Sequence, residues 1–133
     1  MKILVCGSRT FSQRTAIWNT IDKYLDGIEK NECIIIQGGA KGADLIAKEY
    51  CLDNGIKCVT VEAEWDKYGM AAGPIRNQKM LDMKPDLILA FSDKSLNKSK
   101  GTRDMVARAL KENIELEVVY EINPSYPHYR NPY

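Results

Sequence analysis

The sequence of 133 residues contains one histidine, His128, and four cysteines that form no C-x-x-C pair. A zinc site with ordinary paired spacing is therefore not indicated, and we predict no metal and no other cofactor. A serine–histidine–aspartate mechanism is also disfavoured, because His128 has no partner at a recognisable spacing. The cysteines, three of which stand in apolar runs, are interpreted as free thiols: Cys6, Cys33, Cys51 and Cys58.

Long apolar runs and a charge excess are missing as well. No run approaches the roughly 20 residues that a helix needs to cross a bilayer, and the apolar start of the chain stops at Gly7, too early for a signal peptide. We expect no membrane segment and a cytoplasmic protein, in the host cytoplasm if a phage encodes it. The 19 Lys and Arg nearly balance the 18 Asp and Glu. This balance argues against a protein that mainly coats nucleic acid, although it permits a local basic patch.

The pattern that is present alternates short apolar runs with helical periodicity. Strands are predicted over residues 2–6, 33–37, 57–61, 86–91 and 116–120. Helices are predicted over residues 12–25, 43–54, 74–83 and 102–113, with Ser12 as an N-cap and Leu110 on an apolar face. Continuous apolar strands between helices are typical of a parallel sheet covered on both faces. We therefore predict an α/β fold, a single Rossmann-like three-layer domain with a five-stranded parallel sheet over residues 1–120. Residues 121–133 form a Pro/Tyr-rich tail, either an ordered arm or a disordered segment.

Three glycine-bearing loops follow the first, second and fourth predicted strands. In an open α/β sheet, ligands bind at the carboxyl ends of strands, so these loops converge if the first and fourth strands are neighbours. Glycines let the backbone approach an anion, and the helix that follows offers free N–H groups. Hydroxyl and guanidinium groups add donors for phosphate. The candidate ligand-binding residues of the loops are Gly7, Ser8, Arg9, Gly38, Gly39, Ala40, Gly42, Asp44, Ser99, Gly101 and Thr102.

A second candidate region follows the third predicted strand, at residues 62–77. Trp65 can stack on a base or ribose, or pack on the sheet edge. Glu64 can act as an acid or base, or be solvated. Arg76 falls in the first turns of the next helix and can bind phosphate, with Asn77 beside it. Neither a dinucleotide fingerprint nor a Walker loop occurs in the sequence.

Together these motifs resemble the YspA-like branch of the SLOG superfamily, which groups Rossmann-like domains related to DprA and to the LOG phosphoribohydrolases. The resemblance rests on Gly7-Ser8-Arg9, Gly38-Gly39-Ala40-x-Gly42-Ala43-Asp44, Ala72-Gly73-Pro74-x-Arg76-Asn77-x-x-Met80 and Ser99-x-Gly101-Thr102-x-x-Met105. It implies a nucleotide or nucleotide-derived ligand, such as an ADP-ribose-like molecule or a nucleoside phosphate. It also implies a homodimer as a possible assembly.

The LOG enzymes cleave an N-glycosidic bond and carry a glutamate where this chain has Met105. Asp104 is one residue early, which on a helix turns it about 100° away from that position. Asp44 or Glu64 are therefore the alternative acid/base candidates, with Arg76 on phosphate.

Three functions follow from these residues. The first is a binding protein that senses or sequesters a nucleotide-derived ligand. The second is a nucleotide N-glycosidase or phosphoribohydrolase-like hydrolase with Arg76, Asp44 and Glu64 as catalytic residues. The third, by analogy with DprA, is a single-stranded nucleic-acid binder that uses Lys94, Lys98, Lys100 and Arg103, which the net charge of +1 disfavours.

Overall fold

The computed structural model describes residues 1–93 and 99–121 of the chain. Five strands form one all-parallel sheet in the order β3-β2-β1-β4-β5. Each strand lies within one residue of its predicted bounds: β1 Lys2–Gly7, β2 Ile34–Gln37, β3 Lys57–Thr60, β4 Leu87–Ser92 and β5 Leu116–Tyr120. The predicted α/β fold with a five-stranded parallel sheet is confirmed.

Four long helices connect the strands, and short turns of helix lie between them. The long helices are α1 Arg14–Leu25, α2 Ala43–Asn54, α4 Ala72–Asp82 and α5 Lys100–Lys111. The short elements are η1 Lys30–Glu32, α3 Trp65–Tyr68 and η2 Gly69–Ala71. The last helix begins and ends two residues before its predicted bounds. Pro74 lies in the first turn of α4, as predicted.

The predicted N-cap of α1 is wrong. Gln13 occupies the cap position and makes no side-chain cap bond. Ser12 instead donates from its backbone N–H to the Glu121 carboxylate at 2.7 Å, and from its hydroxyl to the same oxygen at 3.3 Å. A carboxylate from the far end of the domain therefore binds the serine that a local pattern assigned to the helix.

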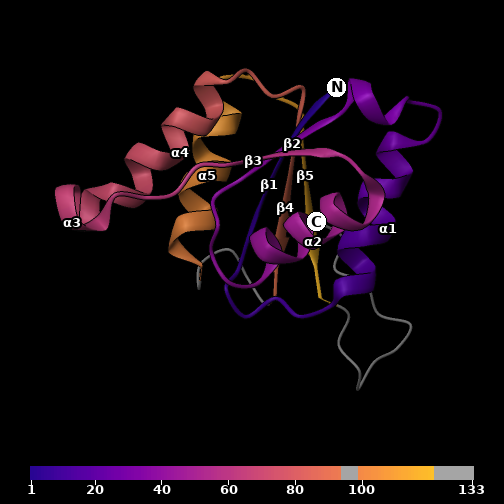
Figure 1. Ribbon diagram of the computed structural model, residues 1–133. Helices are drawn as coiled ribbons and strands as arrows, with labels where there is room; N and C mark the ends of the chain where they lie inside the picture. The colour runs from indigo at the N-terminus through magenta and orange to yellow at the C-terminus, as the bar shows by residue number, and fades with distance from the viewer. Residues whose placement is uncertain (94–98, 122–133) are drawn as a thin grey trace.

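The sheet is covered on both faces, by α1 and α2 on one and by α4 and α5 on the other (Figure 1). Successive residues of β1 alternate between the two cores: Ile3 and Val5 pack toward α1 and α2, and Leu4 and Cys6 toward α4 and α5. Leu110, predicted on the apolar face of α5, is 63% exposed. It lies one position past Ala109, the last residue of α5 that is buried against the sheet.

The strand order places the candidate loops together. β1 pairs with β2 on one side and with β4 on the other, so the order reverses between β1 and β4. The first and fourth strands are thus neighbours, as the convergence of the loops requires. The loops after β1 and β2 and the start of α5 lie at the same edge of the sheet, where α/β domains bind ligands.

Several expectations concern other parts of the chain. Lys94, Lys98 and the tail beyond Glu121 lie outside the described residues. Within the described ranges, none of the helices combines the length and apolar character that a bilayer crossing requires.

Candidate functional site

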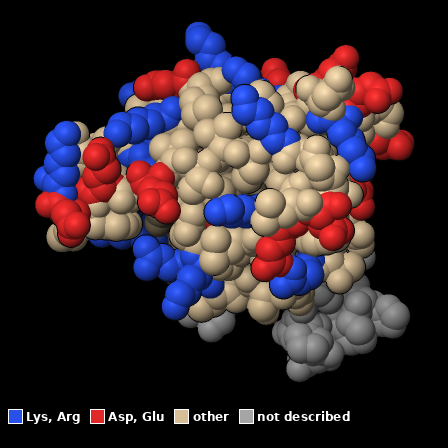
Figure 2. Space-filling model, in the orientation of Figure 1, with Lys and Arg blue, Asp and Glu red and all other residues tan. Residues whose placement is uncertain are grey.

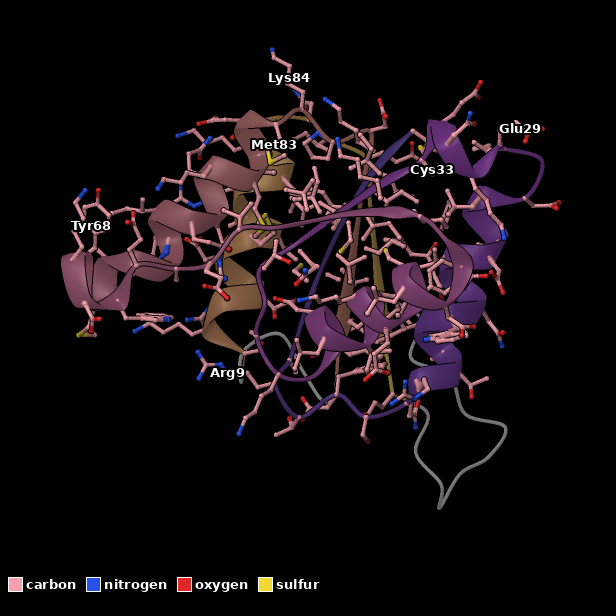
Figure 3. All side chains as sticks on the ribbon, in the orientation of Figure 1. Arg9, Glu29, Cys33, Tyr68, Met83 and Lys84 are labelled. Atoms are coloured by element: carbon pink, nitrogen blue, oxygen red, sulfur yellow. The ribbon has the colours of Figure 1, made fainter. Side chains whose placement is uncertain are left out.

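A cavity of about 990 Å³ opens at the carboxyl edge of β1, between the loop after β1 and helices α4 and α5. Figure 3 shows Arg9 at this edge beside the first turn of α5, while Cys33 and Met83 lie at the opposite edge of the sheet. The predicted site residues that line the cavity are Gly7, Ser8, Arg9, Ala40, Asp44, Trp65, Arg76, Asn77, Ser99, Gly101 and Thr102. Gly38, Gly39, Gly42 and Glu64 are absent from its lining.

Gly7 ends β1 where three segments meet. A Cβ at this position would lie 2.3 Å from the Phe91 carbonyl oxygen and 2.6 Å from the Ala43 Cβ. Only glycine lets β4 and the start of α2 approach this closely. The following Ser8 donates its N–H to the same Phe91 carbonyl at 2.8 Å, and its hydroxyl oxygen accepts from the Asp93 N–H at 3.3 Å. The β1 loop is therefore fixed to the end of β4.

The loop after β2 is braced by a buried carboxylate. Asp44 accepts the N–H groups of Gly38 and Ala40 on one oxygen, at 3.1 and 3.2 Å. On the other side, Arg76 donates from Nη1 to the Gly38 carbonyl oxygen at 2.9 Å. Gly42 has a left-handed φ of 84°, and a Cβ there would meet the Ser8 carbonyl oxygen at 2.3 Å. The loop glycines thus contact protein, whereas Ala40 of the loop and Asp44 at the start of α2 line the cavity.

The environment of Asp44 changes its acidity. Burial raises the pKa of this carboxyl from 3.8 to about 6, against the opposing effects of the Ala40 and Gly38 N–H groups and of Arg76. The carboxyl can therefore gain or lose a proton at mildly acidic pH, as a general acid or base must. Burial also raises the pKa of the neighbouring Cys6 thiol, which keeps that cavity-lining side chain protonated.

Asn77 ties α4 to α5 at the wall of the cavity. The side chain is 4% exposed. Its Oδ1 accepts from Arg76 Nε at 3.2 Å, and its Nδ2 donates to the Gly101 carbonyl at 3.2 Å and to Asp104 Oδ2 at 2.9 Å. Arg108 donates from Nε to the same Asp104 oxygen at 2.9 Å. Both carboxylate contacts use one oxygen of Asp104.

Asp104 lies in the cavity lining, although it is about 100° around α5 from Met105, the position of the family glutamate. Met105 is fully buried between α5 and the sheet. Successive helical residues point about 100° apart. Because Met105 faces the sheet, the preceding Asp104 faces α4 and the cavity. The position carrying the family glutamate is a core position in this chain, and the available carboxylate comes one residue earlier.

The first turn of α5 forms one end of the cavity. Ser99 and Thr102 hydroxyls are joined by a hydrogen bond of 2.8 Å, and the first helical bond runs from the Arg103 N–H to the Ser99 carbonyl at 2.9 Å. N–H groups before that bond have no acceptor within the helix, and they carry partial positive charge. Lys100 and Arg103 line the cavity beside them. This end of the cavity is suited to an anion.

The opposite end is apolar and aromatic. Trp65 of α3 is 49% exposed and Met70 of η2 is 85% exposed, and both line the cavity. Glu64 precedes this short helix, but its carboxylate pairs with Lys79 at 3.2 Å on the surface. Glu64 is therefore paired outside the cavity lining to which Asp44 and Arg76 belong.

Sequence reasoning missed several lining residues. The omitted polar and charged ones are Thr10, Asp93 and Asp104, together with Lys100 and Arg103, which the sequence assigned only to nucleic acid. Asp93 follows β4 directly and accepts a hydrogen bond from the Thr10 hydroxyl. The expectation that ligands bind at the carboxyl ends of strands could have found it. Within residues 1–93 and 99–121, no three His, Cys, Asp or Glu side chains are grouped closely enough to hold a metal ion.

A parallel sheet with helices on both faces and a cavity where the strand order reverses defines a Rossmann-like α/β domain. The profile of the YspA, cpYpsA-related SLOG family matches residues 1–68, and the chain belongs to that family. The chain is also similar to the "Gene 61 protein" of Mycobacterium phage D29, with 34% identity over 121 residues that cover 85% of this chain and 91% of that protein. No solved structure matches it significantly.

Proposed function

We propose that the chain binds a nucleotide or nucleotide-derived ligand in the cavity, as a sensor or a sequestering protein. The observation that carries this proposal is the polarity of the cavity, which has a cationic helix start at one end and an exposed aromatic ring at the other. A nucleoside phosphate has the same polarity, with an anionic group at one end and a flat base at the other. Membership of the SLOG family supports the same class of ligand.

The anion end would receive the phosphate. Arg9 and Arg103 are exposed residues at the cavity, and the start of α5, with its N–H groups, lines the same cavity. Guanidinium groups and helix starts both form charge-assisted hydrogen bonds with phosphate oxygens. The free volume of about 990 Å³ lies at the upper end of ordinary ligand pockets, which favours a dinucleotide-sized molecule such as ADP-ribose over ribose 5-phosphate.

A hydrolase of nucleotide N-glycosidic bonds is the second candidate, and Asp44 favours it. This carboxyl lines the cavity, and its pKa of about 6 fits a group that transfers protons. Its contacts with Gly38 and Ala40 also fit a purely structural role. Release of free base from the bound nucleotide decides between the two roles.

Single-stranded nucleic acid is the third candidate. A group of Lys and Arg side chains lies at the lower left of Figure 2, where Figure 3 labels Arg9, but acidic side chains are interspersed over the rest of this face. The mixed surface favours a small anion at the cavity over a long polyanion.

Thermal-shift measurements test the proposal with AMP, ADP, ADP-ribose, NAD, ribose 5-phosphate, cyclic nucleotides and a short single-stranded oligonucleotide. A ligand at 100 times its Kd adds about 2.7 kcal/mol of stability, which raises Tm by several degrees. We expect such a rise with a nucleotide, weakened by Arg103→Ala and unchanged by Lys111→Ala at the other end of α5. No rise with any nucleotide, or equal rises in both variants, would contradict the proposal.

A further inference from the structure

Cys51 and Cys58 lie next to each other across the turn that joins α2 to β3. Cys51 belongs to the last turn of α2, and Gly55 ends that helix with a left-handed φ of 68°. The Ile56 N–H donates to the Cys51 carbonyl at 3.0 Å, so the chain folds back and β3 begins beside the helix. Both side chains belong to the core under α1 and α2, where the Cys51 thiol is the neighbour with the largest effect on the acidity of Cys58.

The two thiols differ in access and in acidity. Cys51 is 2% exposed, whereas Cys58 is partly exposed on β3, an edge strand of the sheet. The neighbouring Cys51 thiol lowers the pKa of Cys58, with smaller contributions from Gln37 and Lys48 in the same direction and burial opposing them. Cys58 is therefore the thiol that a reagent from solvent reaches first. Its lowered pKa also favours the thiolate, which is the attacking form in thiol–disulfide exchange.

A buried amide connects Cys58 to the glycine loop of the cavity. Gln37 ends β2 and is completely buried. Its Nε2 lies 3.6 Å from the Cys58 sulfur and 2.5 Å from the Thr60 hydroxyl, and its Oε1 accepts the Gly39 N–H at 2.6 Å. The amide group therefore contacts the thiol with one atom and the loop with the other. The Cys58 sulfur and the Gly39 N–H are therefore both contacts of one side-chain amide.

We propose that Cys51 and Cys58 form a reversible thiol–disulfide site whose oxidation loosens the glycine loop after β2. The oxidant class is a small disulfide such as glutathione disulfide. The Cys58 thiolate attacks one glutathione sulfur, which forms a mixed disulfide and releases the first glutathione thiolate. The Cys51 thiol then loses its proton and attacks the Cys58 sulfur, so the Cys51–Cys58 bond forms and the second glutathione leaves. Two protein thiols are oxidised, one glutathione disulfide is reduced, and both protons end on glutathione.

Incubation of the intact chain with glutathione disulfide, followed by mass spectrometry without reducing agent, tests the chemistry. We expect the mass loss of two hydrogen atoms, a peptide linking Cys51 to Cys58, and reversal by reduced glutathione. Cys51→Ala should retain one glutathione on Cys58, and Cys58→Ala should form neither product. Cys33→Ser, which alters another buried thiol of the same core just before β2, should still form the bond because it leaves both partners in place. A stable glutathione adduct on the unaltered chain, or no reaction at Cys58, would overturn the site.

Amide hydrogen exchange tests the connection to the loop without any ligand. In the disulfide form Gln37 faces a neutral sulfur instead of a thiolate, so we expect the Gly39 N–H to exchange severalfold faster than in the reduced chain. The N–H groups in the middle of β1, away from the pair, serve as the internal reference. Equal exchange of Gly39 in the two forms would show that the disulfide does not reach the loop.

Discussion

Arg76 and Gly38 are in direct contact although they belong to different layers of the domain. The guanidinium donates from Nη1 to the Gly38 carbonyl oxygen at 2.9 Å, and a Cβ at position 38 would lie 2.3 Å from the same nitrogen. The absence of a side chain at position 38 leaves the space that the guanidinium group occupies. Arg76 therefore holds the loop after β2 against α4, in addition to lining the cavity where we expect an anion.

Removal of this guanidinium should loosen the loop. Arg76→Met keeps much of the apolar stem and loses the donors to Gly38 and Asn77. Hydrogen bonds from charged groups contribute about 1.5–3 kcal/mol, so we expect a decrease of this size in the free energy of unfolding, measured by urea denaturation. Lys79→Met on the same helix removes only an exposed ion pair with Glu64 and should change stability little. Equal losses in the two variants would mean that the Gly38 contact is not important.

Gly7→Ala should be more harmful than the change at any exposed glycine. The new methyl group would collide with the Phe91 carbonyl and the Ala43 Cβ, both of which belong to regular structure and cannot move aside independently. Overpacking of this kind costs about 1–3 kcal/mol. Gly101→Ala, in the first turn of α5, places its methyl group in open space and should be neutral or slightly stabilising. Thermal unfolding measures the difference in Tm between the two variants. Equal Tm values would mean that β1, β4 and the start of α2 can move apart to accept the methyl group.

The burial of Asp44 should be visible as a dependence of stability on pH. Its pKa in the folded chain, about 6, lies above the ordinary value of 3.8, so the folded chain binds this proton more tightly than the unfolded chain does. Stability contributed by this group is therefore greatest below pH 3.8 and falls as the pH rises to about 6. The fall amounts to about 3 kcal/mol at most.

Asp44→Asn keeps an acceptor for Gly38 and Ala40 and cannot ionise. We expect urea unfolding of this variant to lack the part of the decline that Asp44 causes. Asp53→Asn, on the exposed side of α2, should keep the decline. The pKa assigned to Asp44 would be wrong if the Asp44→Asn curve followed the unaltered chain.

Carboxylates inside and outside the cavity should differ in their effect on nucleotide binding. Asp104 lines the cavity and is oriented by Asn77 and Arg108, so its carboxylate can accept from ligand hydroxyl groups. We expect Asp104→Asn to weaken binding about tenfold, a loss of about 1.4 kcal/mol. Glu64→Gln, at a surface ion pair, should leave the Kd unchanged. Titration calorimetry with the nucleotide found by thermal shift measures the Kd of both variants. A larger loss of affinity in Glu64→Gln than in Asp104→Asn would contradict the placement of Asp104 at the ligand.

The sheet was predictable because each strand is a short apolar run between breakers. Helix α2 has the predicted bounds, since Gly42 and Gly55 interrupt the pattern at both ends. Contacts distant in sequence were not predictable: Glu121 binds Ser12 from 109 positions away. The four-residue helix α3 is too short to show periodicity.

The candidate site was predicted in its location more than in its contacts. Glycine loops at strand ends indicated the correct edge of the sheet. However, a glycine looks the same in sequence whether it faces a ligand or a neighbouring segment, and Gly38 and Gly42 face protein. The placement of Asp104 depended on which side of α5 faces the sheet, and Met105 decides that by its burial.

The cavity takes its walls from two separate stretches of the chain. The loops after β1 and β2 and Trp65 fall within the stretch that the family profile matches, residues 1–68, whereas α4 and α5 follow it. The glycines that hold the ends of β1 and β2 close to neighbouring segments therefore lie on different parts of the chain from the lining that α4 and α5 contribute. A substitution at Arg103 or Asp104 would thus alter the lining of the cavity and leave untouched the close contacts that Gly7 and Gly42 make at the strand ends.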